Sequence, residues 1–104
     1  MKRAVCLATL LALGVAGIGH AQVGVSQQGR VLAQEVCSEC HAVTKGQVRS
    51  PNSRSPTFSE LAGAPGMTSV ALMVALTTPH AGMPMFMLTV EQREDIIAYI
   101  LSLR

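Results

Sequence analysis

The chain has 104 residues and a formal net charge of +2, and this length allows one domain. Lys2 and Arg3 account for that charge, because the other six basic residues equal the six acidic ones in number. A neutral, mixed surface of this kind does not argue for binding to nucleic acid. The chain has two Phe, one Tyr and no Trp, and domains this small often need a disulfide, a metal or another staple for stability.

Residues 1–21 are predicted to be a secretory signal peptide. Two basic residues precede an apolar run over residues 4–18, and small residues follow at the positions that a signal peptidase reads. A membrane anchor is the alternative, but the run is shorter than the roughly 20 apolar residues that span a bilayer. We expect cleavage after Ala21 and a mature domain of residues 22–104, which contains no further stretch apolar enough to cross a membrane.

The first part of the mature domain is predicted to form one helix and a long loop. The helix covers about Gln28–Cys40, where apolar residues recur every four positions and share a face. Residues 42–61 are dense in Gly, Ser, Pro and Asn, which is typical of a loop, with a helical turn at Thr57–Leu61.

Two more helices are predicted in the second half. One covers about Ser69–Leu76 and is apolar on two faces, which indicates burial. The last begins after Thr89, which forms a capping box with Gln92. Its apolar stripe consists of Ile96, Tyr99, Ile100 and Leu103. No run alternates long enough for a strand, so the predicted fold class is all-α, with about three main helices.

Cys37, Cys40 and His41 stand together in the segment EVCSECH, and Cys6 would leave with the signal peptide. A disulfide is possible in an exported protein but leaves His41 unexplained. A thioredoxin-like redox pair would require strands around it. A structural zinc ion needs four ligands, and His80 could complete such a set.

Covalent haem is the fourth chemistry, and CxxCH is its attachment pattern. Cys37 and Cys40 are three residues apart, so on a helix they share a face and can reach two vinyl groups on one edge of a porphyrin. His41 follows directly and can bind the iron. Because haem would also supply the bulky apolar group that the composition lacks, the sequence predicts one covalently attached haem c.

An electron carrier with low-spin iron needs a second ligand opposite His41, and Met83 is the preferred candidate. Met83 lies in an irregular loop, where Gly82 gives the backbone freedom and Pro84 stiffens it. Met85 is the second choice. For the remaining candidates, core packing or a loop position is the simpler interpretation; these are Met67, Met73, His80 and Met87.

These motifs resemble those of the small class I c-type cytochromes that bacteria export. The segments CSECH, SPTF, PHAGMP and EQREDIIAYILSL occur in the order found in that family and cover most of the mature chain. The resemblance implies the cytochrome c fold, with the first and last helices crossing at right angles beside the haem. At that crossing Tyr99 would pack near Gly29 or Ala33.

The resemblance also assigns roles in the site. It implies that His41 and Met83 bind the iron, and that the backbone carbonyl of Pro56 accepts a hydrogen bond from Nδ1 of His41. The residues that would hold the haem propionates are not marked by any motif. The available candidates are Arg49, Asn52 and Arg54.

The function predicted on this basis is one-electron transfer in the periplasm between exported redox proteins. The chain is not expected to be an enzyme, because a filled sixth iron position leaves no place for a substrate. Two alternatives remain open at this point. One is a small haem subunit of a dehydrogenase complex, and the other is a haem enzyme or sensor with a labile sixth ligand.

Overall fold

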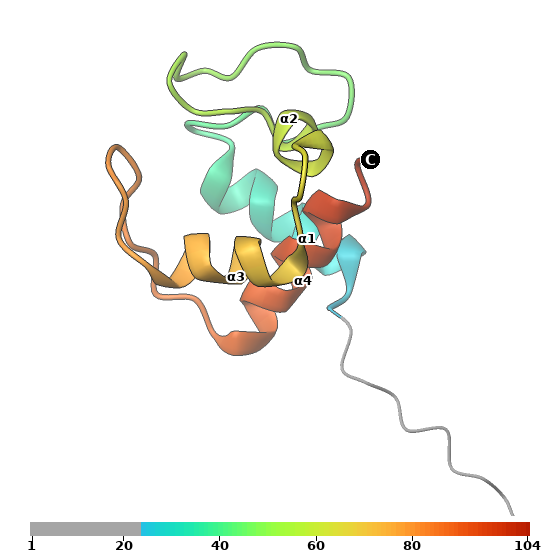
Figure 1. The fold of residues 1–104 in the computed structure, drawn as a ribbon, viewed down its shortest axis with the longest axis vertical. Coiled ribbons are helices and arrows are strands. Elements are labelled where there is room, and N and C mark those ends of the chain that lie inside the picture. The colour runs from blue at the N-terminus through green and yellow to red at the C-terminus, as the bar shows by residue number, and fades with distance from the viewer. Residues whose placement is uncertain (1–23) are drawn as a thin grey trace, which may run out of the picture.

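The computed structural model describes residues 24–104, so the predicted signal peptide lies outside the described residues. This part of the chain is helical and contains no β-strand, which confirms the all-α prediction (Figure 1). The elements are α1 (Ser26–Leu32), a π-helical turn η1 (Ala33–Cys37), α2 (Phe58–Gly63), α3 (Ser69–Thr77) and α4 (Val90–Leu101).

The first helix differs from its predicted bounds at both ends. It begins at Ser26, and beyond Leu32 it continues as the π-helical η1, where the N–H of Ser38 donates to the carbonyl of Ala33. The helix ends at Cys37, so Cys40 lies outside it. The N–H groups of Cys40 and His41 both donate to the carbonyl of Cys37, at 3.2 and 2.9 Å, which closes a tight turn. π-helical turns of this kind are rare and are frequently found at functional sites.

Two helices begin at capping boxes. At α4 the Thr89 side chain accepts from the N–H of Gln92, and the Gln92 side chain accepts from the N–H of Thr89, as predicted. Thr57 and Glu60 form the same pair of hydrogen bonds at the start of α2. This capping box starts a helix that runs to Gly63, two residues beyond the helical turn that the sequence predicts over Thr57–Leu61.

The core forms where α1 passes behind α4 (Figure 1). Gly29 of α1 lies so close to α4 that a Cβ atom there would overlap the backbone carbonyl of Asp95. Gly29 therefore faces the Asp95–Ile96 peptide, whereas Ala33 and Tyr99 both belong to the buried core. The hydroxyl of Tyr99 donates to the carbonyl of Val43, at 2.6 Å. Among residues 24–104, no helix is long and apolar enough to cross a membrane.

Gly29→Ala is expected to destabilise the protein, because the added methyl group would push α1 away from α4. Overpacking of this kind costs about 1–3 kcal/mol, which outweighs the better helix propensity of Ala. Gly63→Ala is the matched control, since no atom lies within 4 Å of a Cβ at the end of α2. Chemical denaturation of the haem-bound protein should show a loss for Gly29→Ala alone, and equal stability of the two variants would contradict the close helix contact.

Candidate haem site

A cavity of about 470 Å³ lies between the loop before α2, the helices α3 and α4, and the segment after α3. Its volume is within the range of pockets that bind cofactors. Most of its wall is apolar, and Arg54 is the one Asp, Glu, Lys or Arg residue in the wall. A second cavity of about 250 Å³ shares five lining residues with the first, which are Cys37, His41, Ser55, Gly82 and Met83.

His41 lines both cavities, and its orientation is fixed by two neighbours. Its Nδ1 lies 2.7 Å from the backbone oxygen of Pro56. A carbonyl oxygen can only accept a hydrogen bond, so Nδ1 is the donor in this contact, and Nε2 is the ring nitrogen left to bind a metal. The ring also packs against Phe58, with 5.5 Å between ring centroids. The Pro56 carbonyl and the Phe58 ring together hold the imidazole in place.

Cys37 and Cys40 are both free thiols. Cys37 is buried and lines both cavities, whereas Cys40 is half-buried and lines the smaller one. Burial raises the pKa of the Cys37 thiol to about 11, so this group is neutral at physiological pH. No group of three or more His, Cys, Asp or Glu side chains within residues 24–104 could hold a metal ion, so this geometry gives no support to the zinc alternative.

The cavities distinguish Met83 from the methionines that follow it. Met83 is half-buried and lines both cavities, whereas Met85 and Met87 are exposed and line neither. Met83 and His80 lie at opposite ends of one turn, in which the N–H of Met83 donates to the carbonyl of His80. Gly82 has a φ of +80° in this turn, a value that favours glycine.

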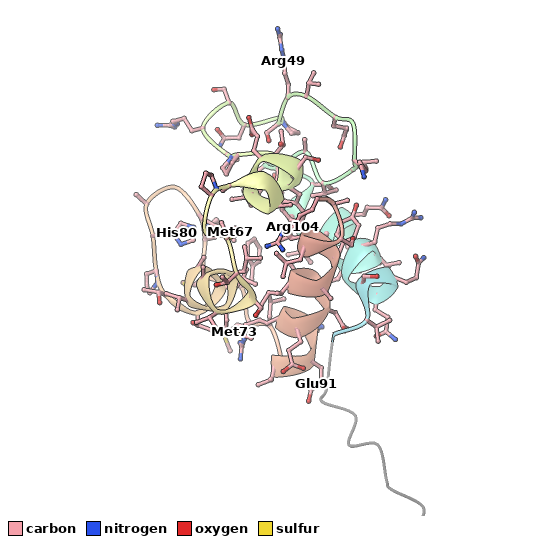
Figure 2. The ribbon with its side chains drawn as sticks, turned by 45° about the vertical axis from the view of Figure 1, so that its right-hand side comes forward. Arg49, Met67, Met73, His80, Glu91 and Arg104 are labelled. Carbon is pink, nitrogen blue, oxygen red and sulfur yellow. The ribbon has the colours of Figure 1, made fainter. Side chains whose placement is uncertain are left out.

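The remaining candidate ligands divide between the two sides of α3. His80 and Met67 line the larger cavity, and in Figure 2 both lie on the side of α3 opposite Met73. Met73 lines neither cavity and packs against the core. His80 Nδ1 lies 3.2 Å from the carbonyl of Thr78, which leaves its Nε2 without a role in that turn.

The candidates for the propionates are also separated by the structure. Asn52 and Arg54 line the larger cavity, whereas Arg49 does not, and Figure 2 shows its side chain at the outer edge of the loop, pointing away. Asn52 is held by its N–H, which donates to the carbonyl of Cys40. Its side-chain oxygen accepts from the N–H of Arg54, at 3.0 Å, so the two residues form one small turn at the cavity wall.

Two side chains, Arg104 and Tyr99, support the site through contacts that the sequence does not predict. Arg104 donates from Nη2 to the carbonyl of Met67 and from Nε to that of Ala62, at 2.6 and 3.2 Å. It thereby ties the end of the chain to the cavity wall between α2 and α3. The Tyr99 hydroxyl likewise holds Val43, two residues after His41. The only sequence signal for the Arg104 contacts is the isolated arginine at position 104. No sequence pattern indicates that Val43 is the partner of Tyr99.

These features fit a covalently bound haem: an apolar cavity, two free thiols three residues apart at its edge, and an imidazole with a free Nε2. They define a small, all-helical protein of the c-type haem class. A comparison with protein families agrees, because residues 26–104 match the model of the cytochrome c family. The chain therefore belongs to the cytochrome c family, and it is a haem-based electron carrier with covalently bound haem c.

A curated relative extends the match to nearly the whole chain. Over 102 residues the chain is 35% identical to cytochrome c-552 of Bradyrhizobium diazoefficiens, and the alignment covers 98% of this chain and 94% of that protein. No solved structure matches the chain.

Tyr99→Phe is expected to lower the stability of the haem-bound protein, because it leaves the buried carbonyl of Val43 without its donor. The cost should be about 1–3 kcal/mol at neutral pH. Burial raises the pKa of Tyr99 above its ordinary value of 10.0, although nearby Arg30 acts in the opposite direction. The hydroxyl therefore stabilises the fold below about pH 10, and this contribution is lost as pH rises through the folded-state pKa.

Denaturation of both proteins at about pH 8 and about pH 11 tests this prediction, since the stability difference between them should shrink at the higher pH. Tyr99 is the single tyrosine, so its ionisation can be followed by ultraviolet difference absorbance. A difference that stays constant with pH would show that the hydroxyl makes no hydrogen bond of consequence.

Proposed function

We propose that the protein is a periplasmic one-electron carrier between exported redox proteins, and that it performs no bond chemistry of its own. When bound, the haem supplies an iron that alternates between the ferrous and ferric states. The observation that carries the proposal is that His41 and Met83 line the same two cavities, so that a haem iron bound there would have two protein ligands available. With both positions filled, no site is left for a substrate.

The residues of this chain have distinct roles in the proposal. Cys37 and Cys40 hold the porphyrin through thioether bonds at the edge of the cavity. His41 provides the first iron ligand, and the Pro56 carbonyl fixes its ring and makes it a stronger donor. Arg54 offers its guanidinium to the carboxylate groups of the haem, because it is the cation in the cavity wall.

Met83 is the second iron ligand in the proposal and the residue that most affects the potential. A thioether is a neutral, soft donor that favours ferrous iron and raises the reduction potential relative to a second histidine. The turn that carries Met83 has a glycine at its third position and a proline directly after it. This turn can therefore hold the sulfur without the constraints of a helix.

Export is supported by the predicted signal peptide of residues 1–21. The bacterial origin of the relative is consistent with a periplasmic location. The partners in this proposal are other exported redox proteins, one donor and one acceptor.

The intact mass of protein purified from the periplasm of a host that attaches haem c should equal residues 22–104 plus one haem. Cys37→Ala should leave at most one thioether bond, and the same holds for Cys40→Ala. Covalent haem should be lost only when both cysteines are replaced. A chain that retains residues 1–21 would contradict export with cleavage, and a haem-free mass with a Cys37–Cys40 disulfide would contradict haem attachment at these residues.

Met83→Ala should abolish the weak long-wavelength absorption band of Met–iron coordination and lower the reduction potential. The cavity left beside the ring should cost about 1 kcal/mol or more in stability. Met85→Ala is the matched control two residues away, and it should retain both the band and the potential because Met85 is exposed outside the cavities.

The two variants also separate the alternatives. Loss of the band in Met85→Ala but not in Met83→Ala would assign the second ligand to Met85. Absence of the band in the unmutated protein, together with binding of carbon monoxide, would overturn the carrier proposal in favour of an enzyme or sensor.

A further inference from the structure

Residues 64–68 connect α2 to α3 and form a thin part of the cavity wall. Met67 lines the larger cavity and is half-buried, whereas Pro65 and Gly66 before it are exposed and line neither cavity. The N–H of Met67 donates to the carbonyl of Ala64, at 3.1 Å, and Gly66 has a φ of +74°. This is the pattern of a type II turn, with proline second and glycine third. The turn therefore presents Met67 to the cavity on a connector that has solvent on its other side.

Arg104 binds this connector and the helix before it. Its Nη2 donates to the carbonyl of Met67, at 2.6 Å, and its Nε donates to the carbonyl of Ala62, at 3.2 Å. Ala62 lies in the last turn of α2, where carbonyl groups lack a partner within the helix and a nearby cation is favourable. In Figure 2 Met67 and Arg104 lie together below α2. One guanidinium group thus links the end of α2 to the residue that lines the cavity.

The backbone that carries Arg104 is itself fixed to α4. Leu103 is buried, and its N–H donates to the carbonyl of Ile100, at 3.0 Å. Ile96 and Ile100 are four residues apart, so they share a face of α4, and both line the larger cavity. Arg104 therefore joins two walls of one cavity, which are the helix α4 and the connector after α2.

We propose that Arg104 is a positioning residue for the haem, which holds Met67 against the porphyrin and keeps water out of the cavity between α2 and α3. This proposal rests on the proposed carrier function and names a residue that tunes it. The access of solvent to a haem controls its reduction potential, because water stabilises the additional positive charge of ferric iron better than an apolar wall does. A closed wall at Met67 therefore raises the potential, and an opened wall lowers it.

Substitution of Arg104 separates the position of the wall from the charge of the side chain. Lysine keeps the positive charge but donates from a single nitrogen instead of from a planar fork, so it cannot reproduce the paired contact. Voltammetry of the haem-bound proteins should therefore show a lower reduction potential for both Arg104→Lys and Arg104→Gln. An unchanged potential in Arg104→Lys would assign any effect of Arg104→Gln to charge and would overturn the proposal. Arg104→Lys alone decides the question if Arg104→Gln does not accumulate.

Arg93 provides the matched control on the same helix. Its Nη1 donates to the carbonyl of Leu88, at 2.7 Å, and neither residue lines either cavity. Arg93→Lys and Arg93→Gln therefore remove the same kind of contact, and the glutamine variant removes the same charge. Both should lower the free energy of unfolding and leave the reduction potential unchanged. Equal shifts of the potential in the Arg93 and Arg104 variants would show a general effect of lost stability or charge, which would overturn the proposal.

NMR of the ferrous protein reports on the position of Met67 directly. The porphyrin ring current should shift the Met67 methyl signal, which can be assigned by its absence in Met67→Leu. In Arg104→Lys this signal should move towards its ordinary position. The Met67 amide should exchange with solvent roughly tenfold faster, as expected for loss of one hydrogen bond of ordinary strength. An unchanged methyl signal and amide exchange rate in Arg104→Lys would contradict the positioning role even if the variant were less stable.

A double-mutant cycle tests whether Arg104 acts through Met67. Met67→Ala should lower the reduction potential by itself, and adding Arg104→Lys should then lower it little further, because the side chain to be positioned is absent. Fully additive shifts would show that Arg104 acts by another route and would overturn the proposal. If the unmutated protein shows no reversible one-electron couple, the carrier proposal fails, whereas a reversible couple whose potential is the same in the Arg104 variants overturns only the role of Arg104.

Discussion

The contact between α1 and α4 at Gly29 is the constraint on which the rest of the structure depends. Because Gly29 has no side chain, the first helix lies directly against the Asp95–Ile96 peptide. This approach brings Cys37, at the end of η1, and Ile96 and Ile100, on α4, to the wall of one cavity. A larger residue at Gly29 would separate the segment that carries the cysteines from the helix that forms one wall of the cavity.

Irregular segments form part of the cavity wall beside α2 and α3, and three side chains hold loops of the fold by binding backbone carbonyls. Tyr99 binds Val43, Arg104 binds Met67, and His41 binds Pro56. Such bonds replace the regular ladder that a helix or sheet would provide, and they use carbonyl groups that loops leave unsatisfied. They connect the last helix and the haem-binding turn to loops that have little regular structure, so a small domain can keep a cavity of about 470 Å³ open for its cofactor.

Much of the site could be predicted from local patterns. The spacing of Cys37, Cys40 and His41 indicates haem c, which is the cofactor of the family to which the chain belongs. Gly82 and Pro84, on either side of Met83, indicate an irregular loop in which Met83 could act as a ligand. The Thr89–Gln92 capping box correctly marked the start of the last helix. The roles of His41 and Met83 as iron ligands remain predictions, because they depend on a haem that would bind between segments far apart in the chain. The partners of Tyr99 and Arg104 could not be predicted, since neither Val43 nor Met67 carries a local signal for a carbonyl acceptor.

The sequence by itself determined the helical class, the haem-attachment motif and the identity of the residues able to bind iron, because each is encoded within a few neighbouring positions. The tertiary structure decided which of the methionines line the cavities and which part of the first helix touches the last. It separated Met83 from Met85: the two residues are only two positions apart in the chain, but Met83 is half-buried and Met85 is exposed. It also set the Asp95–Ile96 peptide against Gly29. Such choices depend on packing between distant segments, where a difference of one helical turn changes every contact and no local pattern records the outcome.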